Sequence, residues 1–340
     1  MGETTKGLML LLVAGVTNAS FTLPMKFTRR WAWENTWLIF TIFALLVLPP
    51  VVTFLTVPHV GQVYAEVGAS LVLTVAAFGA GWGVAQVLFG LAVDAIGIAL
   101  TFSIVLGMSA AIGSMIPLIR LHPEKVFSHT GLGVMAGVVL VVIGVVICAI
   151  AGRRREAALG VSGASGGGRS HSQGLLMAIF SGLGAAMVNF GLAFGGPLLA
   201  SAQKLGADPV WAPNAAWLPV MVAGSIPNLL YCLYLLNRNK TSGRFADSGT
   251  SAYWFYAFVM AGFWFGSTSL YGIASGKLGS WGTILGWPLF MSLIVITASV
   301  LGILTGEWKN SGKQPLRIQI SAVAVLVLAV FVLAVASRWT

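Results

Sequence analysis

The chain has 340 residues, of which 57% are hydrophobic and only 8% are charged, and its formal net charge is +10. Its mean hydropathy of +0.91 is too high for the core and surface of a soluble protein, so the composition excludes a soluble globular fold. The basic residues gather in loops between apolar segments, which points to orientation in a membrane, and we expect no nucleic-acid partner.

Ten apolar segments, each long enough to cross a bilayer, fill the chain almost end to end. Roughly 20 apolar residues in a helix span about 30 Å of hydrocarbon. A β-barrel would instead show short alternating segments, which the sequence lacks. We therefore expect an all-α integral membrane protein whose first segment is retained as a span. The expected spans are residues 7–26, 36–57, 71–93, 98–119, 132–151, 174–199, 212–236, 252–275, 281–304 and 316–337.

The longest polar interruption, residues 152–173, contains three consecutive arginines and a stretch rich in glycine and serine. Such a composition is typical of a flexible linker. It separates residues 1–151 from residues 174–340, and each part holds five expected spans. Because five is odd, the second part enters the membrane upside down relative to the first. The sequence thus predicts two inverted five-helix repeats.

Matching residues at matching spacings support this repeat, because a set of four in the third span recurs in the eighth. Inverted repeats are typical of secondary transporters, whose substrate sites lie between the two halves near the bilayer midplane. The expected mechanism is therefore alternating access. The matched residues are Trp82, Phe89, Gly90 and Gly97 in the third span, and Trp264, Tyr271, Gly272 and Gly279 in the eighth.

The basic residues also predict an orientation. Thirteen of the nineteen Lys and Arg residues fall in the odd-numbered loops of the ten-span arrangement. Loops that carry an excess of Lys and Arg stay in the cytoplasm, so we expect the odd-numbered loops inside and both termini outside.

Neutral polar groups lie within the spans, whereas we expect the ionisable side chains near span ends. Residues three or four positions apart share a helix face. One stripe is therefore formed by Trp82, Gln86 and Phe89, and its repeat-related counterpart by Trp264, Thr268, Tyr271 and Ser275. Each stripe joins a flat aromatic ring to hydrogen-bonding groups, a pairing that suits the apolar face and hydroxyl rim of a sugar. Ordinary packing between helices is the competing interpretation. The candidate substrate-binding residues are Asn18, Thr22, Trp82, Gln86, Phe89, Asn189, Trp264, Thr268 and Tyr271.

Two unusual segments resemble one family. Residues 21–37 read FTLPMKFTRRWAWENTW and residues 307–315 read EWKNSGKQP, and both resemble the bacterial L-rhamnose–proton symporters, as do Trp82-Gly83 and Phe89-Gly90-Leu91 between them. The resemblance implies a ten-helix importer of L-rhamnose and protons, in the bacterial inner membrane and in the drug/metabolite transporter superfamily. Phe21, in the first of these segments, is a further candidate sugar-binding residue. The chain departs from the family pattern around Gln86, Asp94 and Trp287, which leaves the sugar and the coupling open. Because these departures fall where the pocket is expected, Trp287 is also a candidate sugar-binding residue.

Coupling to protons requires a group that changes its protonation state during the cycle. Asp94, in the turn after the third span, and Glu34, in the segment shared with the family, are the candidates for this role. Lys26 is expected to pair with an acidic residue, to line the route or to anchor the helix at the interface. Asp94 and Lys277 hold nearly equivalent positions in the two repeats, so we expect them on opposite membrane faces as parts of an inner and an outer gate.

An intramembrane enzyme is the competing class of function. It would require converging acid, base or metal groups, whereas the four histidines fall in expected loops. We therefore expect no catalytic residue, metal or cofactor. A uniporter or exporter of another small neutral sugar or metabolite, with the same fold, is the nearer alternative. The sequence indicates neither the direction of transport nor the oligomeric state.

Overall fold

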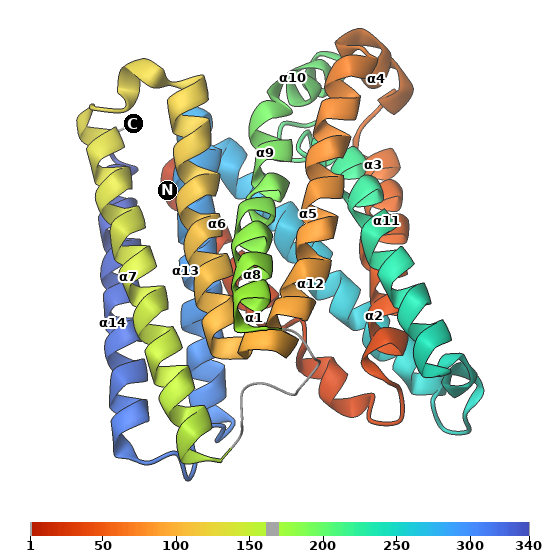
Figure 1. Cartoon of the computed structure of the whole chain (residues 1–340). Helices are drawn as coiled ribbons and strands as arrows, with labels where there is room; N and C mark the ends of the chain where they lie inside the picture. The colour runs from red at the N-terminus through yellow and green to blue at the C-terminus, as the bar shows by residue number, and fades with distance from the viewer. Residues whose placement is uncertain (1, 161–169, 340) are drawn as a thin grey trace.

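The computed structural model describes residues 2–160 and 170–339, and over these residues ten helices or helix groups are long and apolar enough to cross a membrane. They stand side by side in one bundle (Figure 1). The expected all-α membrane class with ten spans is thereby confirmed. The first five spans are α1 (Glu3–Ser20) with η1 (Leu23–Phe27), α2 (Trp33–Thr41) with η2 (Ile42–Val47) and α3 (Leu48–Thr56), α5 (Ala69–Ile96), α6 (Ile98–Leu121), and α7 (His129–Ala158).

The last five spans follow after the polar segment. They are α8 (His171–Ala185) with α9 (Met187–Phe194) and α10 (Gly196–Lys204), α11 (Asn214–Asn239), α12 (Ser251–Lys277), α13 (Gly282–Leu304), and α14 (Lys313–Ala336). Short helices occupy some of the connections between spans. These are α4 (Val60–Val67), η3 (Pro123–Lys125), η4 (Ser242–Ala246) and η5 (Gly279–Trp281).

The polar segment after the fifth span is shorter than the expected linker of residues 152–173. The helix α7 continues through the three arginines to Ala158, and α8 begins at His171 behind the N-cap Ser170. Arginine is a good helix former, so a helix that has left the apolar layer continues into the polar region. Most of the glycine- and serine-rich stretch, residues 161–169, lies outside the described residues.

Two of the ten spans are interrupted. In the second span, Pro49 and Pro50 lack backbone N–H groups, and the preceding turns widen into the π-helix η2. In the sixth span, the helix breaks at Ala186 and again at Gly195, two residues before Pro197. At such an interruption, backbone N–H and C=O groups lose their partners within the helix. A membrane protein tolerates this where other parts of the protein surround these groups.

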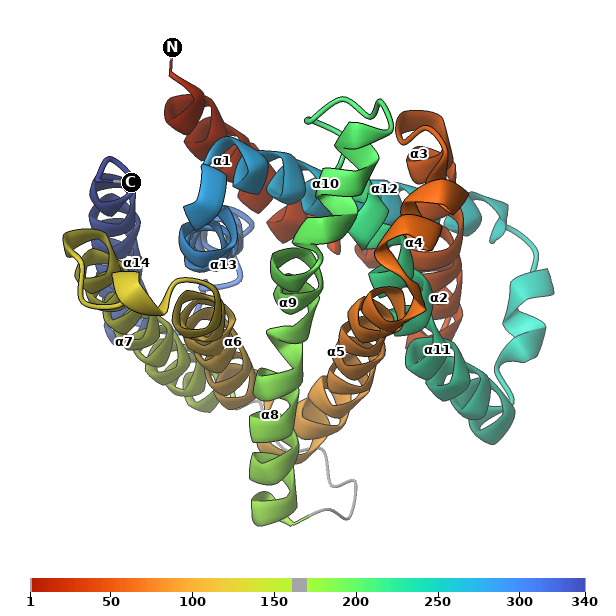
Figure 2. The same cartoon turned by 90° about the horizontal axis from the view of Figure 1, so that it is seen from above.

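The helices pack in a regular pattern. The first span, α1, lies against α12 and α13, and the sixth span, α8, lies against α5 and α6. The fifth and tenth spans, α7 and α14, run along each other at one side of the bundle, as Figure 2 shows from above. The helix α11 packs against both α5 and α2.

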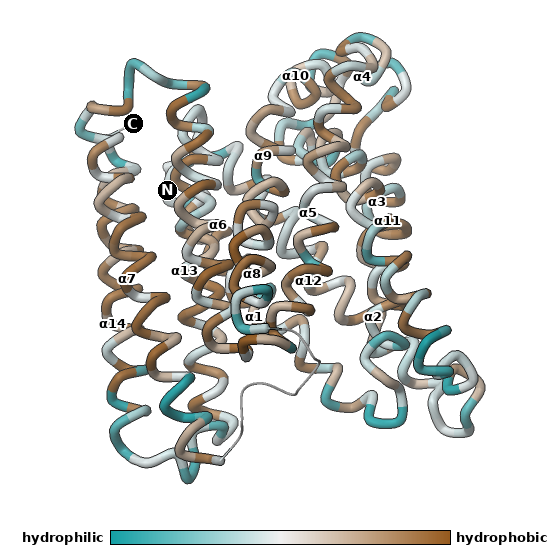
Figure 3. The backbone as a smooth tube through the Cα atoms, viewed as in Figure 1, coloured by the Kyte–Doolittle hydropathy of each residue, from teal (hydrophilic) through white to brown (hydrophobic). Residues whose placement is uncertain are grey.

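Hydrophobic residues dominate the middle of the bundle and polar residues its two ends (Figure 3). Both described ends of the chain lie at the end that also carries α4 and α10, which we call the termini end (Figure 1). The opposite end carries the three consecutive arginines of α7, and we call it the arginine-rich end. The spans alternate in direction between these two ends, so the turn after α5 and the turn after α12 lie at opposite ends.

Candidate functional site

Two of the expected site residues stack on each other at the centre of the bundle. The indole rings of Trp82 on α5 and Trp264 on α12 lie 5.4 Å apart between centroids, with an interplanar angle of 21°. The backbone of α11 supports Trp82 from behind, because a Cβ at Gly224 would lie 2.8 Å from its ring. The third and eighth spans therefore meet through a pair of flat aromatic surfaces.

Further aromatic rings extend this pair toward α1 and α2. The ring of Phe40 meets Trp264 edge to face at 6.2 Å, and Phe21 stacks on Phe40 at 5.5 Å. Trp37 lies 4.8 Å from Phe40. We call these five rings the aromatic cluster. Its members come from α2, α5, α12 and the residue after α1.

Polar side chains lie beside the aromatic cluster. Asn18 donates its side-chain amide to Ser267 Oγ at 2.8 Å, and the hydroxyl of Thr268 bonds back to the carbonyl oxygen of Trp264 at 3.0 Å. Gln86 lies one helical turn after Trp82, is half-buried, and makes no hydrogen bond with the residues that the structure describes. These side chains place hydrogen-bonding groups beside the rings of the aromatic cluster.

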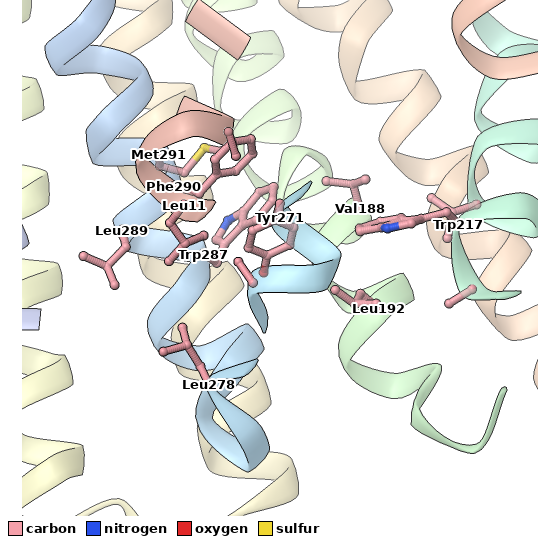
Figure 4. Packing of buried hydrophobic residues seen from close by; sticks show 14 of the residues in the cluster. Leu11, Val188, Leu192, Trp217, Tyr271, Leu278, Trp287, Leu289, Phe290 and Met291 are labelled. Atoms are coloured by element: carbon pink, nitrogen blue, oxygen red, sulfur yellow. The ribbon is translucent and has the colours of Figure 1, made fainter. Parts of the chain in front are cut away.

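A second group of rings surrounds Tyr271, which is fully buried. Its ring stacks on Phe290 at 5.1 Å and meets Trp287 at 5.4 Å, while Trp217 of α11 lies 6.3 Å away. Figure 4 shows these side chains together with the apolar residues that enclose them. Tyr271 is seven residues beyond Trp264 on α12, so this group lies nearer the termini end than the aromatic cluster.

Asn189 of α9 ties three helices together beside Tyr271. It is completely buried. Its Nδ2 donates to the carbonyl oxygen of Gly113 at 2.9 Å and to that of Thr283 at 3.1 Å, while its Oδ1 accepts the hydroxyl of Tyr271. Pro117 lies four residues after Gly113 and has no N–H, so the helix itself cannot satisfy that carbonyl. The Asn189 side chain supplies the missing donor.

A second proline creates the reciprocal contact between α6 and α13. Pro288 leaves the carbonyl oxygen of Ile284 without its helical donor, and Ser114 Oγ of α6 donates to it at 2.6 Å. From α13, Trp287 Nε1 donates back to the carbonyl oxygen of Ser109 at 3.0 Å. We call these contacts, together with those of Asn189, the crossing layer. It joins α6 and α9 to α12 and α13.

Burial differs between the crossing layer and the aromatic cluster. Asn189 and Tyr271 are 0% exposed and Trp287 is 5% exposed, whereas Asn18 and Gln86 beside the aromatic cluster are half-buried. Hydrogen bonds between buried groups therefore hold the crossing layer together.

Two expected sugar-binding residues lie apart from both groups. Phe89 packs edge to face against Phe102 of α6 at 4.9 Å, which engages its ring within the first five spans. Thr22 follows the end of α1 and is exposed. Sequence spacing placed Phe89 on the face of Trp82, but the turn between α5 and α6 brings Phe102 against it.

The acidic candidates differ in their surroundings. Glu34 is 4% exposed, and its Oε1 accepts Asn239 Nδ2 at 3.0 Å and Thr241 Oγ1 at 2.7 Å. Within the described part of the chain no Lys or Arg lies within salt-bridge distance of it. Asp94 is half-buried at the end of α5, near the arginine-rich end.

The basic candidates form ion pairs at opposite ends of the bundle. Lys26 Nζ lies 3.6 Å from Glu307 Oε1, which links η1 to the loop after α13. Lys277 Nζ lies 2.7 Å from Glu3 Oε2, and this pair links the end of α12 to the start of α1. Of the roles expected for Lys26, the structure shows pairing with an acidic residue.

Several residues of the site were not singled out from the sequence. A proline within a span is a recognisable signal, because it leaves one backbone carbonyl without its helical donor. A polar residue on a neighbouring helix can supply that donor, but the sequence does not say which helix is the neighbour. The additional residues are Trp37, Phe40, Ser109, Ser114, Trp217, Ser267 and Phe290.

The model of the family described as L-rhamnose-proton symport protein (RhaT) matches residues 2–337 of the chain. The chain belongs to this family. An L-rhamnose-proton symporter of Mannheimia succiniciproducens is 28% identical to it over 336 residues, which are 96% of both chains. Relatives of the same description from Klebsiella pneumoniae and Salmonella gallinarum are each 26% identical over 332 residues, again 96% of both chains.

Membership in the L-rhamnose-proton symport protein family makes the chain a multi-pass membrane transporter and not an enzyme. The family resemblance of the segments at residues 21–37 and 307–315 is therefore confirmed. Lys26 from the first segment and Glu307 from the second form the ion pair described above, so the two segments also meet in space. The roles of the individual site residues remain predictions.

Proposed function

We propose that the chain imports L-rhamnose together with protons by alternating access, because its relatives are L-rhamnose-proton symporters. The observation that carries this proposal is the stacked pair Trp82 and Trp264, with polar side chains beside it, between helices of the two halves of the chain. L-rhamnose is a neutral deoxyhexose with an apolar face and a rim of hydroxyls. Indole surfaces and neutral amides suit both parts without burying a charge.

The sugar binds in this proposal between α5 and α12, where the two indoles now contact each other. Asn18 and Gln86 provide amides for the hydroxyls, and Thr268 provides a hydroxyl of its own. The other expected residues, Asn189 and Tyr271, act one layer further toward the termini end, in the crossing layer that must separate when the transporter opens on that side.

Alternating access follows from the two inverted repeats, residues 1–151 and 174–340, that we propose for the chain. The helix contacts support them: α1 packs on α12 and α13 in the same way that α8 packs on α5 and α6, with the two halves exchanged. The stacked indoles belong to α5 and α12, the third helix of each repeat. Such an architecture also supports the placement of the family within the drug/metabolite transporter superfamily.

The orientation that we propose places both termini outside the bacterial inner membrane and the arginine-rich end in the cytoplasm. The excess of Lys and Arg at that end supports it. In this orientation the crossing layer lies nearer the outer side and the aromatic cluster lies nearer the cytoplasm.

Glu34 is the proton-binding group in this proposal. A carboxylate buried at the end of a span is costly, and such residues mark proton routes in transporters. Its two partners, Asn239 and Thr241, belong to the end of α11, so a change in its protonation state alters the contact between α2 and α11. Asp94 and Lys277 act as parts of the inner and outer gates, and Lys26 holds the inner end of α1 through Glu307.

The test is uptake of labelled L-rhamnose into proteoliposomes that contain the purified chain, with and without an inward proton gradient. Accumulation only with the gradient, blocked better by L-rhamnose than by L-fucose, L-lyxose or D-glucose, supports the proposal. Equilibration without accumulation indicates a uniporter. A folded protein that takes up no L-rhamnose contradicts the assigned sugar, and the departures around Gln86 and Trp287 then mark a different substrate.

A further inference from the structure

A pocket of about 250 Å³ opens at the termini end, away from the aromatic cluster. It lies between the start of α1, the end of α10 and the end of α12. Its volume is near the lower end of the range of ligand pockets, roughly 300 Å³, which suits a molecule no larger than a monosaccharide. The lining includes Glu3, Gln203, Val210, Gly276, Lys277 and Gly279.

The polar groups of this pocket provide both donors and acceptors. Lys277 Nζ and Lys6 Nζ lie 2.7 Å and 2.5 Å from the two carboxylate oxygens of Glu3. Each carboxylate oxygen accepts more than one hydrogen bond, so Glu3 retains acceptor capacity, and Gln203 adds an amide. Because the charges are already paired with one another, the pocket offers hydrogen bonds to hydroxyls without requiring a charged ligand.

A strip of glycines on α12 leads from the pocket toward the centre of the bundle. Gly276 lines the pocket, and Gly272 lies one helical turn deeper. A Cβ at Gly272 would lie 2.7 Å from Trp217 Nε1, so the indole nitrogen lies directly against this glycine. The strip therefore connects the pocket to Trp217, which in turn lies beside Tyr271.

Trp217 carries a buried donor without a partner. The side chain is 0% exposed, and its Nε1 makes no hydrogen bond among the described residues. A buried polar group without a partner costs about 1–3 kcal/mol, and such groups are rare enough in native proteins to require an explanation. A ligand hydroxyl that passes along α12 would satisfy this donor.

We propose that the pocket is an outer sugar-binding site, where Glu3, Gln203 and Lys277 hold the hydroxyls of the incoming monosaccharide. The N–H of Trp217 is the first donor that the sugar meets when it moves from this site toward the crossing layer. The inference rests on the proposed function, because its ligand is the transported sugar. It adds a second site, separate from the aromatic cluster, to the transport route.

The first experiment fills the pocket with Gly276→Leu in the full chain and measures equilibrium binding and uptake of labelled L-rhamnose. No neighbouring atom lies within 4 Å of a Cβ at Gly276, so the fold accepts the change. Gly262→Leu is the matched control, because Gly262 lies on the same helix with equally open space around it. We expect the wild type to bind two sugars per chain and Gly276→Leu one, with a KM for uptake about tenfold higher.

The second experiment replaces Trp217 with Phe, which keeps an aromatic ring and removes the unpartnered N–H. We expect the maximal uptake rate to fall at least about fivefold while the thermal midpoint stays equal or rises, because a buried unsatisfied donor has been removed. A residue with a purely structural role would not change the rate without lowering stability.

The outcomes separate this inference from the proposed function. Wild-type uptake of L-rhamnose, together with one binding site and unchanged kinetics in both Gly276→Leu and Trp217→Phe, overturns the outer site and leaves the symporter intact. A wild-type protein that neither binds nor transports L-rhamnose overturns the proposed function and the outer site with it.

Discussion

Asn189 donates its side-chain amide to the carbonyl oxygen of Gly113 at 2.9 Å, across 76 residues of sequence. The contact exists because Pro117 cannot supply the backbone N–H that this carbonyl would otherwise accept. The carbonyl that Pro117 leaves free in α6 thereby becomes an attachment point for α9. The same amide reaches Thr283 and Tyr271, so one side chain holds four helices together in the crossing layer.

Replacing Asn189 by Ala should destabilise the protein and disturb transport. The change leaves the buried hydroxyl of Tyr271 and the carbonyl of Gly113 without partners, at a cost of about 1–3 kcal/mol for each such group. Adding Pro117→Ala should restore part of the stability, because the helix then supplies its own donor to Gly113. Thermal unfolding of the two single variants and the double variant measures this coupling, and strictly additive effects would contradict it.

Removal of the indole at Trp82 should weaken sugar binding. Trp82→Ala deletes one of the two stacked flat surfaces, and we expect a loss of about 1–3 kcal/mol, or roughly fivefold to 150-fold in affinity. Trp82→Phe should retain much of the binding, since it keeps an aromatic face. Equilibrium binding of labelled L-rhamnose measures the difference.

Phe255→Ala is the control for the indole variant, because Phe255 is an aromatic residue of α12 that is 63% exposed and lies outside the aromatic cluster. Its affinity for L-rhamnose should equal that of the wild type. An equal loss of binding in both variants would show that the effect of Trp82→Ala is not specific to the site.

Glu34→Gln should uncouple uptake from the proton gradient. The amide oxygen of Gln still accepts from Asn239 and Thr241, so the fold is kept while the titratable group is lost. We expect sugar exchange between internal and external L-rhamnose to persist and gradient-driven accumulation to disappear. Glu124→Gln, in the loop after α6, is the control, and accumulation at the wild-type level by Glu34→Gln would assign coupling to another group.

Neutralising the two proposed gate residues should affect opposite sides of the membrane. Lys277→Gln breaks the ion pair with Glu3 at the termini end, and Asp94→Asn acts at the arginine-rich end. Accessibility of single cysteines to a thiol reagent, added from one side or the other of sealed vesicles, should rise on the side of the neutralised gate. Unchanged labelling and unchanged transport in both variants would remove the gate assignment.

The contact between α4 and α10 should weaken in acid. Hydrogen bonds from Ser201 and from Lys204 hold the pKa of Glu66 below its usual value. A carboxyl with a lowered folded-state pKa contributes stability that is fully present above the unfolded value of about 4.3, and that is lost as the pH falls through the folded value. Hydrogen exchange of α4 should therefore increase below about pH 4 in the wild type, and Glu66→Gln should show little pH dependence there.

Sequence spacing predicted which residues share a face of one helix. It did not predict which residue of a neighbouring helix packs against that face. The spacing of Trp82 and Trp264 placed each on a helix face, and in the structure these two faces meet. The same spacing placed Phe89 beside Trp82, but Phe102 of the following helix occupies its ring. Trp217 was not singled out, since its unpartnered N–H appears only once α11 and α12 are packed together.

The sequence by itself determined the number of spans, their order and the all-α class, because a helix that crosses lipid must be apolar and must satisfy its own backbone hydrogen bonds. These are properties of each segment alone. Only the tertiary structure decided which polar groups meet. Asn18 and Ser267 are 249 residues apart, and Ser114 reaches the carbonyl oxygen of Ile284 across 170. Such pairs depend on helix packing, in which small residues and prolines set how closely two backbones approach, and no local pattern encodes the partner.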